Sequence, residues 1–202
     1  MPVSGTTIDL TALTVTGYEE ICEGDVNVQI LDSLGRGGEI YSWYDVPEAN
    51  LYGWLDGSDE PVEAGAVTLA PGEGLWVNAP GEDYGLQSAG QVPTSDIAVV
   101  LRQDFKLVVN PAPVTVDLTA ISVTGYEEIC EGEVNVQILD SLGRGGEIYS
   151  WYDVPEADLY GWLDGSDEPL EEEVVTLAAG EGLWVNAPSS DYSIKFPGVA
   201  IK

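Results

Sequence analysis

The sequence of 202 residues contains no histidine. The side chain that most often serves as a general base near neutral pH, and that most often binds transition metals, is therefore missing. Triads of serine, histidine and aspartate and pairs of cysteine with histidine are excluded, and zinc, copper and haem sites are disfavoured. We therefore expect a protein that binds or builds rather than an enzyme, and we expect no organic cofactor.

Basic residues are scarce, because six Lys and Arg stand against 36 Asp and Glu and give a formal net charge of −30. Such a surface repels the phosphates of nucleic acids and the headgroups of anionic lipids, so neither is an expected partner. The acidic residues also repel one another in the folded state, and added salt relieves this repulsion.

Long apolar runs are absent as well. No stretch approaches the 18 residues that a membrane-spanning helix requires, so we expect no membrane insertion. The first residues, MPVSGTTIDL, contain neither the basic segment nor the apolar segment of a signal peptide. An extracellular or cell-surface location is the expectation that fits the rest of the sequence, and a cytoplasmic location is the alternative.

The chain has two cysteines, Cys22 and Cys130. They occupy equivalent positions in a repeat described below, so no disulfide bond can form within either copy. We expect two free thiols that serve as small, half-buried apolar residues. The alternative is a disulfide bond between Cys22 and Cys130, or between molecules.

A long internal repeat is the main feature that the sequence does contain. Residues 9–84 recur without a gap 108 positions later as residues 117–192, and 65 of the 76 aligned positions are identical. The repeat predicts two tandem domains that arose by internal duplication, residues 1–92 and 114–202. Near-identical copies provide valency, which benefits binding and structural proteins more directly than enzymes.

The local sequence patterns are those of β-strands. Residues 26–30 alternate apolar and polar side chains, and residues 39–44 are rich in aromatics. A glycine-rich turn at residues 34–38 would join these two strands into a hairpin. Further short strands are expected at residues 52–55, 66–69 and 75–78, with turn residues between them. We predict an all-β fold made of two antiparallel β-sandwich or barrel-like domains.

The segment of residues 93–113 occurs once. Two apolar runs, 97–101 and 105–109, flank a short polar stretch and predict an extra central β-hairpin packed on one or both repeats. If the hairpin completes the sheet of repeat 2, the same position on repeat 1 is open to strand addition from another chain. The alternative is that the hairpin closes repeat 1 or is shared.

Acidic residues are concentrated in one loop of each repeat. Carboxylates beside a serine hydroxyl and free loop carbonyls are ligands that calcium accepts, although the spacing is not that of an EF-hand. A solvated acidic turn is the alternative. The calcium hypothesis names these residues: Asp56, Asp59, Glu60, Asp164, Asp167 and Glu168.

Aromatic residues recur at equivalent positions of both repeats. In a strand only one face can be core, so the other face could display rings that suit a sugar or a protein partner. The alternative is that the rings are buried and pair across strands. A bivalent carbohydrate-binding site would use these residues: Tyr41, Trp43, Trp54, Tyr149, Trp151 and Trp162.

Two short motifs resemble modules of exported, repetitive all-β proteins of bacteria. They are PGEGLWVNAP at residues 71–80 and VVNPAPVTVDL at residues 108–118. The resemblance implies an extracellular setting and supplies no catalytic residues. The combined expectation is a non-enzymatic structural or adhesive protein of the bacterial surface or of an extracellular assembly. It would associate with itself or with another surface protein through β-strand addition, and bivalent glycan binding is the alternative function.

Overall fold

The computed structural model describes residues 7–31, 37–70, 72–81, 83–88, 93–101, 103–139 and 144–199. The prediction of an all-β protein is confirmed, because these residues form short antiparallel sheets and four single-turn 3-10 helices. Within the described residues no sheet closes into a barrel. Most of the glycine-rich turn predicted at residues 34–38 lies outside the described residues.

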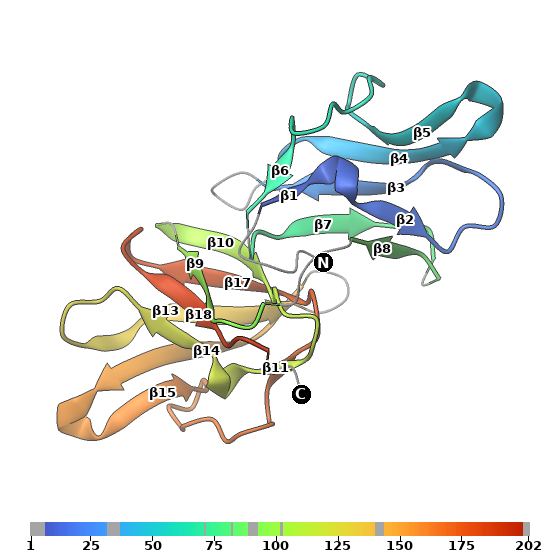
Figure 1. Ribbon diagram of the computed structural model, residues 1–202. Helices are drawn as coiled ribbons and strands as arrows, with labels where there is room; N and C mark the ends of the chain where they lie inside the picture. Colours follow the sequence, from blue (N-terminus) through green and yellow to red (C-terminus); the bar gives the residue numbers. More distant parts are fainter. Residues whose placement is uncertain are drawn as a thin grey trace.

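Repeat 1 contains a four-stranded sheet in the order β5-β4-β3-β7 and two small sheets, β1-β6 and β2-β8 (Figure 1). Each strand alternates side chains between the space that separates these sheets and the outside. The elements are β1 (Ile8–Asp9), η1 (Leu10–Ala12), β2 (Thr14–Thr16), β3 (Cys22–Ile30), β4 (Ile40–Val46), η2 (Pro47–Ala49), β5 (Leu51–Leu55), β6 (Thr68–Leu69), β7 (Leu75–Asn78) and β8 (Gly85–Gln87).

Repeat 2 has the same elements in the same order. They are β11 (Val116–Asp117), η3 (Leu118–Ala120), β12 (Ser122–Thr124), β13 (Cys130–Leu139), β14 (Gly145–Val154), η4 (Pro155–Ala157), β15 (Leu159–Leu163), β16 (Thr176–Leu177), β17 (Gly182–Ala187) and β18 (Ser193–Phe196). The strand registers also agree at a spacing of 108 residues, since Val28 pairs with Val77 and Val136 pairs with Val185. That the two bodies arose by duplication remains an interpretation of the sequence.

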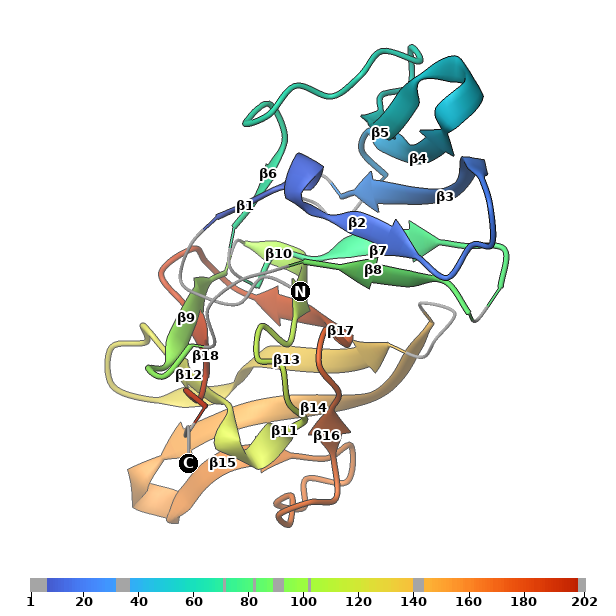
Figure 2. The ribbon, with the colours of Figure 1, turned by 45° about the vertical axis from the view of Figure 1, so that its right-hand side comes forward.

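The central hairpin consists of β9 (Ile97–Val100) and β10 (Asp104–Val109). Strand β10 extends the main sheet of repeat 2 to the order β10-β17-β13-β14-β15, and β9 extends a second sheet to the order β12-β18-β9. Figure 2 shows β9 and β10 beside β18 and β17, on the side of repeat 2 that is turned toward repeat 1. The hairpin therefore adds one strand to each of two sheets of repeat 2.

The opposite edge of each main sheet is covered by the chain itself. After β5 the chain turns back, and Val62 N–H donates to the Trp54 carbonyl at 2.9 Å, next to a bridge between Leu55 and Pro61. Leu170 and Trp162 repeat this contact in repeat 2 at the same distance. Because proline has no N–H and the turn is compact, these edges are poor templates for another strand.

The cores of the two repeats differ in size. Among the described residues, the buried cluster of repeat 2 contains 21 residues and that of repeat 1 contains ten. Four of the additional residues come from the hairpin, namely Ile97, Val99, Leu101 and Val108. Repeat 1 thus has the same sequence pattern as repeat 2 but a smaller sealed interior. The described residues form no helix that is long and apolar enough to cross a membrane.

Candidate functional site: the open edge of repeat 1

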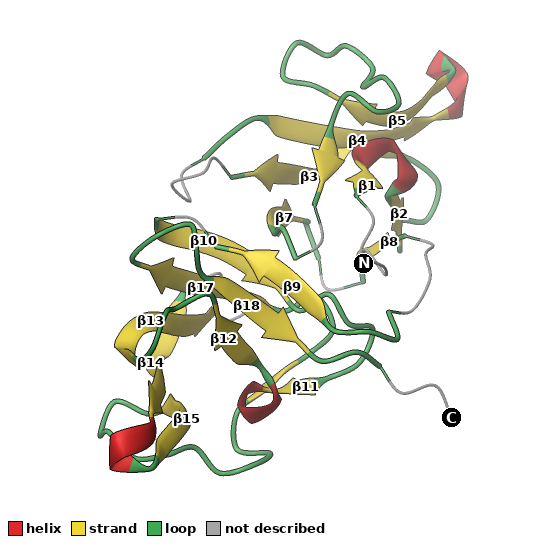
Figure 3. Ribbon diagram, turned by 60° about the vertical axis from the view of Figure 1, so that its left-hand side comes forward, coloured by secondary structure: helices red, strands yellow, loops and turns green. Residues whose placement is uncertain are grey.

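The outer edge of repeat 1 is formed by β7 and β8, and we call it the open edge. No described strand pairs with the side of β7 that faces away from β3. The equivalent side of β17 pairs with β10 along six residues, from Asp104 opposite Ala187 to Val109 opposite Gly182. In Figure 3, β7 and β8 lie where the two repeats meet, while β9 and β10 are laid against repeat 2.

The sequence of the open edge is the same as that of the covered edge. Residues 72–80 and 180–188 both read GEGLWVNAP, yet Val77 is 48% exposed and Val185 is 1% exposed. Leu183 and Ala187 are likewise fully buried, whereas their equivalents Leu75 and Ala79 remain partly exposed. One peptide therefore occupies two environments, and the difference is produced by the hairpin alone.

Strand β8 shows the same difference. Leu86 is partly exposed, while its equivalent Ile194 is completely buried beneath β9. In repeat 2 the strand extends to Phe196, which pairs with Ile97 and is also buried. Without a partner of the β9 type, β8 ends at Gln87.

An apolar cavity of about 120 Å³ opens between the two sheets of repeat 1 at this edge. Its wall contains apolar side chains from both sheets together with Val109 of the hairpin. The lining residues from repeat 1 are Leu13, Leu69, Glu73, Leu75, Val77 and Leu86. In repeat 2 the corresponding space is sealed, because Val99 and Val108 join the core there.

The hairpin touches repeat 1 at one end of this edge. Val109 N–H donates to the Gly72 carbonyl at 3.0 Å, and Val108 forms an isolated bridge with Glu73. A Cβ atom on Gly74 would lie 2.6 Å from Leu107 Cγ, so glycine is needed for this close approach. These contacts stop before β7 begins, and they leave Val77 and the rest of the strand uncovered.

Asn110 fixes the hairpin to repeat 2. It is the one polar residue that is fully buried among those described, and its side-chain amide donates to the carbonyls of Val114, Leu177 and Ala178 at 2.9–3.0 Å. Its backbone N–H donates to the Glu181 carbonyl at 2.9 Å. Because buried polar groups are costly unless they are paired, this residue holds the hairpin end in one position.

The calcium hypothesis is not supported by the geometry of the acidic loops. The Asp56 carboxylate accepts hydrogen bonds from the backbone N–H groups of Ser58 and Glu60 at 2.8 and 3.1 Å, and Asp164 does the same with Ser166 and Glu168. These carboxylates close a turn of their own chain. Within the described residues no group of three or more potential ligands could hold a metal ion, so Asp59, Glu60, Asp167 and Glu168 form no calcium site with them.

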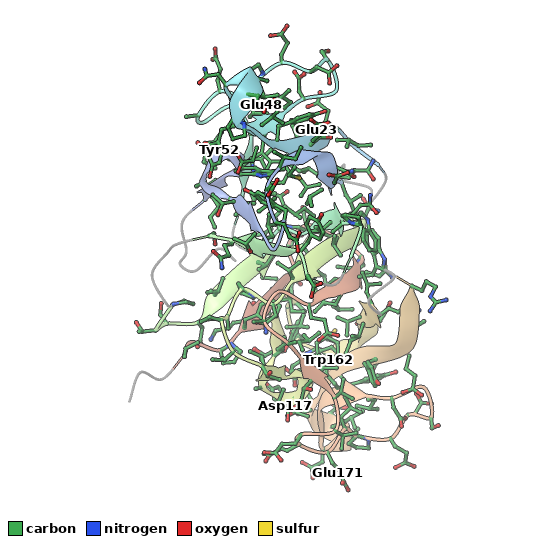
Figure 4. The ribbon with its side chains drawn as sticks, turned by 90° about the vertical axis from the view of Figure 1, so that its right-hand side faces the viewer. Glu23, Glu48, Tyr52, Asp117, Trp162 and Glu171 are labelled. Carbon is green, nitrogen blue, oxygen red and sulfur yellow. The ribbon has the colours of Figure 1, made fainter. Side chains whose placement is uncertain are left out.

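The six aromatic residues proposed for carbohydrate binding lie in the core, and that prediction is wrong. All six are between 1% and 7% exposed, namely Tyr41, Trp43, Trp54, Tyr149, Trp151 and Trp162. Figure 4 shows Trp162 among the strands of repeat 2, and its indole N–H donates to the Ile121 carbonyl at 2.7 Å. The strand faces were paired correctly, but the face that carries Tyr41 and Trp43 is the inner one.

Burial also affects the ionisation of these rings. Removal from water raises the pKa of Tyr41 to about 12, and a hydrogen bond to Glu39 at 2.5 Å acts in the same direction. The exposed aromatic of this sheet is instead Tyr52, 68% exposed, which packs edge-on against Trp43. Sequence analysis did not select Tyr52, and nothing gathers around it to form a site.

The two cysteines are free and fully buried, so the alternative of a disulfide bond is wrong. The Cys22 thiol lies 3.6 Å from the Trp43 carbonyl, and Cys130 lies 3.7 Å from the Trp151 carbonyl. Burial raises the pKa of the Cys130 thiol to about 12, and the nearby Glu133 carboxylate adds to the shift. These thiols behave as small apolar core residues.

Comparison with protein-family models, with curated proteins and with solved structures finds no match to this chain.

Proposed function

We propose that this protein is a non-enzymatic structural or adhesive component of the bacterial surface or of an extracellular assembly. It joins its neighbours through β-strand addition at the open edge of repeat 1. The observation that carries this proposal is the pair of Val77 and Val185, identical in sequence context but 48% and 1% exposed. An uncovered strand with an apolar interior behind it is the usual acceptor for an added strand.

Several features agree with a structural role. The opposite edge of each main sheet is covered by its own turn, so addition is directed to one side of repeat 1. The carboxylates of Glu48 and Glu171 lie at opposite ends of the molecule in Figure 4, far from the junction. The extracellular setting rests on the resemblance of the two short motifs to exported bacterial modules.

Analytical ultracentrifugation across protein concentration tests the proposal. We expect reversible association of the wild-type chain that Val77→Lys reduces, because a lysine on β7 would bring its charge to the edge where the second strand docks. Val174→Lys is the matched control, since Val174 is 65% exposed in a loop outside the open edge. A monomer at millimolar concentration in all salt conditions would count against strand addition between copies, as would an equal effect of both lysines.

A further inference from the structure

The occupant of the open edge can be deduced from repeat 2, where the same edge is filled. We infer that repeat 1 accepts, in trans, a β-hairpin of the type formed by residues 97–109, supplied by another protein. This inference rests on the proposed function and specifies its partner. The hairpin would place one strand on β7 and one on β8, as β10 and β9 do on β17 and β18.

The register of the donor strand follows from identical sequence. Leu183 pairs with Val108, and Val185 pairs with Lys106. Since residues 72–80 and 180–188 are the same, the equivalent donor residues would face Leu75 and Val77. A valine at the position of Val108 would enter the 120 Å³ cavity, whose walls include Leu13, Leu69 and Leu86.

Charge favours a hairpin of this kind. Between Asp9 and Tyr84 repeat 1 contains 16 acidic residues and one basic residue, so another acidic segment would be repelled. The stretch of residues 93–113 is neutral, because Arg102 and Lys106 balance Asp96 and Asp104. Its inward positions in repeat 2 are apolar, which matches the cavity at the open edge.

Two observations indicate that the donor is a separate molecule with a free hairpin. First, position 2 is the equivalent of Asn110, and it is a proline. Proline has neither the side-chain amide nor the backbone N–H with which Asn110 anchors the hairpin in repeat 2. A hairpin entering repeat 1 through this position would lack that anchor.

Second, the described residues contain one hairpin for two acceptor edges. A copy that gave its hairpin to another copy would open its own repeat 2, so exchange between copies closes no additional edge. The donor must therefore carry a hairpin that is not already paired.

A synthetic peptide of residues 93–113 provides the probe. Titration into the full chain, followed by isothermal calorimetry, should show one binding site per chain, and Val77→Lys should weaken binding by at least about tenfold. A peptide with Val108→Asp is the matched control and should not bind. Equal binding to wild-type and Val77→Lys chains, or none to the wild type, would overturn the inference.

A grafted chain keeps the test decisive if the peptide alone does not fold. Residues 93–113 are fused directly to Thr6, which restores the spacing found before repeat 2. Amide hydrogen exchange in β7 and β8 should then slow by about tenfold or more, and peptide binding should disappear. Unchanged exchange there would refute the hairpin as occupant. If Val77→Lys blocks self-association while peptide and graft have no effect, the proposed function stands and this inference falls.

Discussion

Replacing Val77 and Val185 separately by alanine tests whether the open edge exists in solution. The two residues have the same neighbours in sequence, the same partner strand and the same register, since Val77 pairs with Val28 and Val185 with Val136. They differ in cover, because β10 seals Val185 but no described strand lies over Val77. Any difference between the two variants therefore measures the effect of the hairpin.

The size of the difference can be worked out from burial. Valine to alanine removes two methyl groups, at about 0.8 kcal/mol for each group that is fully buried, and a cavity adds to the loss. For Val185, 1% exposed, the free energy of unfolding of repeat 2 should fall by about 2–3 kcal/mol. For Val77, 48% exposed, about half of the transfer term applies and no cavity forms, so the loss should be about 1 kcal/mol or less.

Hydrogen exchange with mass spectrometry resolves the two repeats, because peptides from residues 68–78 and 176–186 report on them separately. Thermal unfolding is a second readout, in which a difference of about 1.5 kcal/mol corresponds to about 6–12 °C for domains of this size. Measurements at low protein concentration keep the open edge free of partners. Equal losses at the two positions would show that Val77 is covered in solution and would refute the reasoning.

Three further predictions concern other parts of the chain. The Cys130 thiol should not react with a disulfide reagent until the protein unfolds, because burial raises its pKa to about 12; rapid labelling of the native chain would contradict this. Partial burial raises the pKa of Asp117, but hydrogen bonds from Thr119 and the Glu173 N–H lower it further, so its net pKa lies below the ordinary value. The stability contributed by Asp117 should thus be complete above about pH 4 and lost as pH falls through the lowered pKa. Asp117→Asn should flatten the acid limb of a stability curve, and an unchanged limb would show that the carboxylate contributes nothing. Calcium should raise the melting temperature no more than sodium at equal ionic strength, because the Asp56 carboxylate already accepts two backbone hydrogen bonds.

The strands were predictable where alternation is regular. Residues 26–30 and 39–44 lie in β3 and β4, and 75–78 coincides with β7. The strand expected at residues 66–69 is shorter, because only Thr68 and Leu69 pair with β1. Pairing partners that lie far apart in the chain set this limit, and local composition does not contain that information.

The aromatic residues show a different limit. A period of two specifies that Tyr41 and Trp43 share a face, but it does not specify which face is inner. Edge-to-face packing of Trp43 on Trp54, with ring centroids 5.3 Å apart, and the hydrogen bond from Trp54 to the Leu13 carbonyl place both rings in the core. Both partners come from other strands, so the inner face became known only from the assembled sheets.

The open edge could be anticipated only from what occurs once. Sequence analysis identified the central hairpin as an element without a counterpart, and from this it derived the possibility of an uncovered edge on repeat 1. It could not identify Val77, because the nine residues around Val77 and Val185 are identical. Burial of such a strand is a property of its neighbour, and the pairing of β10 with β17 decides which copy is sealed.

The acidity of the chain and the open edge are compatible for a physical reason. An uncovered strand with an apolar cavity behind it invites indiscriminate pairing between copies, which proteins commonly limit by placing charge nearby. With a net charge of −30, two copies repel each other over about one Debye length, roughly 10 Å at 0.1 M salt. A neutral hairpin such as residues 93–113 meets no such repulsion. The same charge that keeps copies apart therefore leaves the edge accessible to a hairpin, so that selectivity for the donor needs no charged contact within the edge itself.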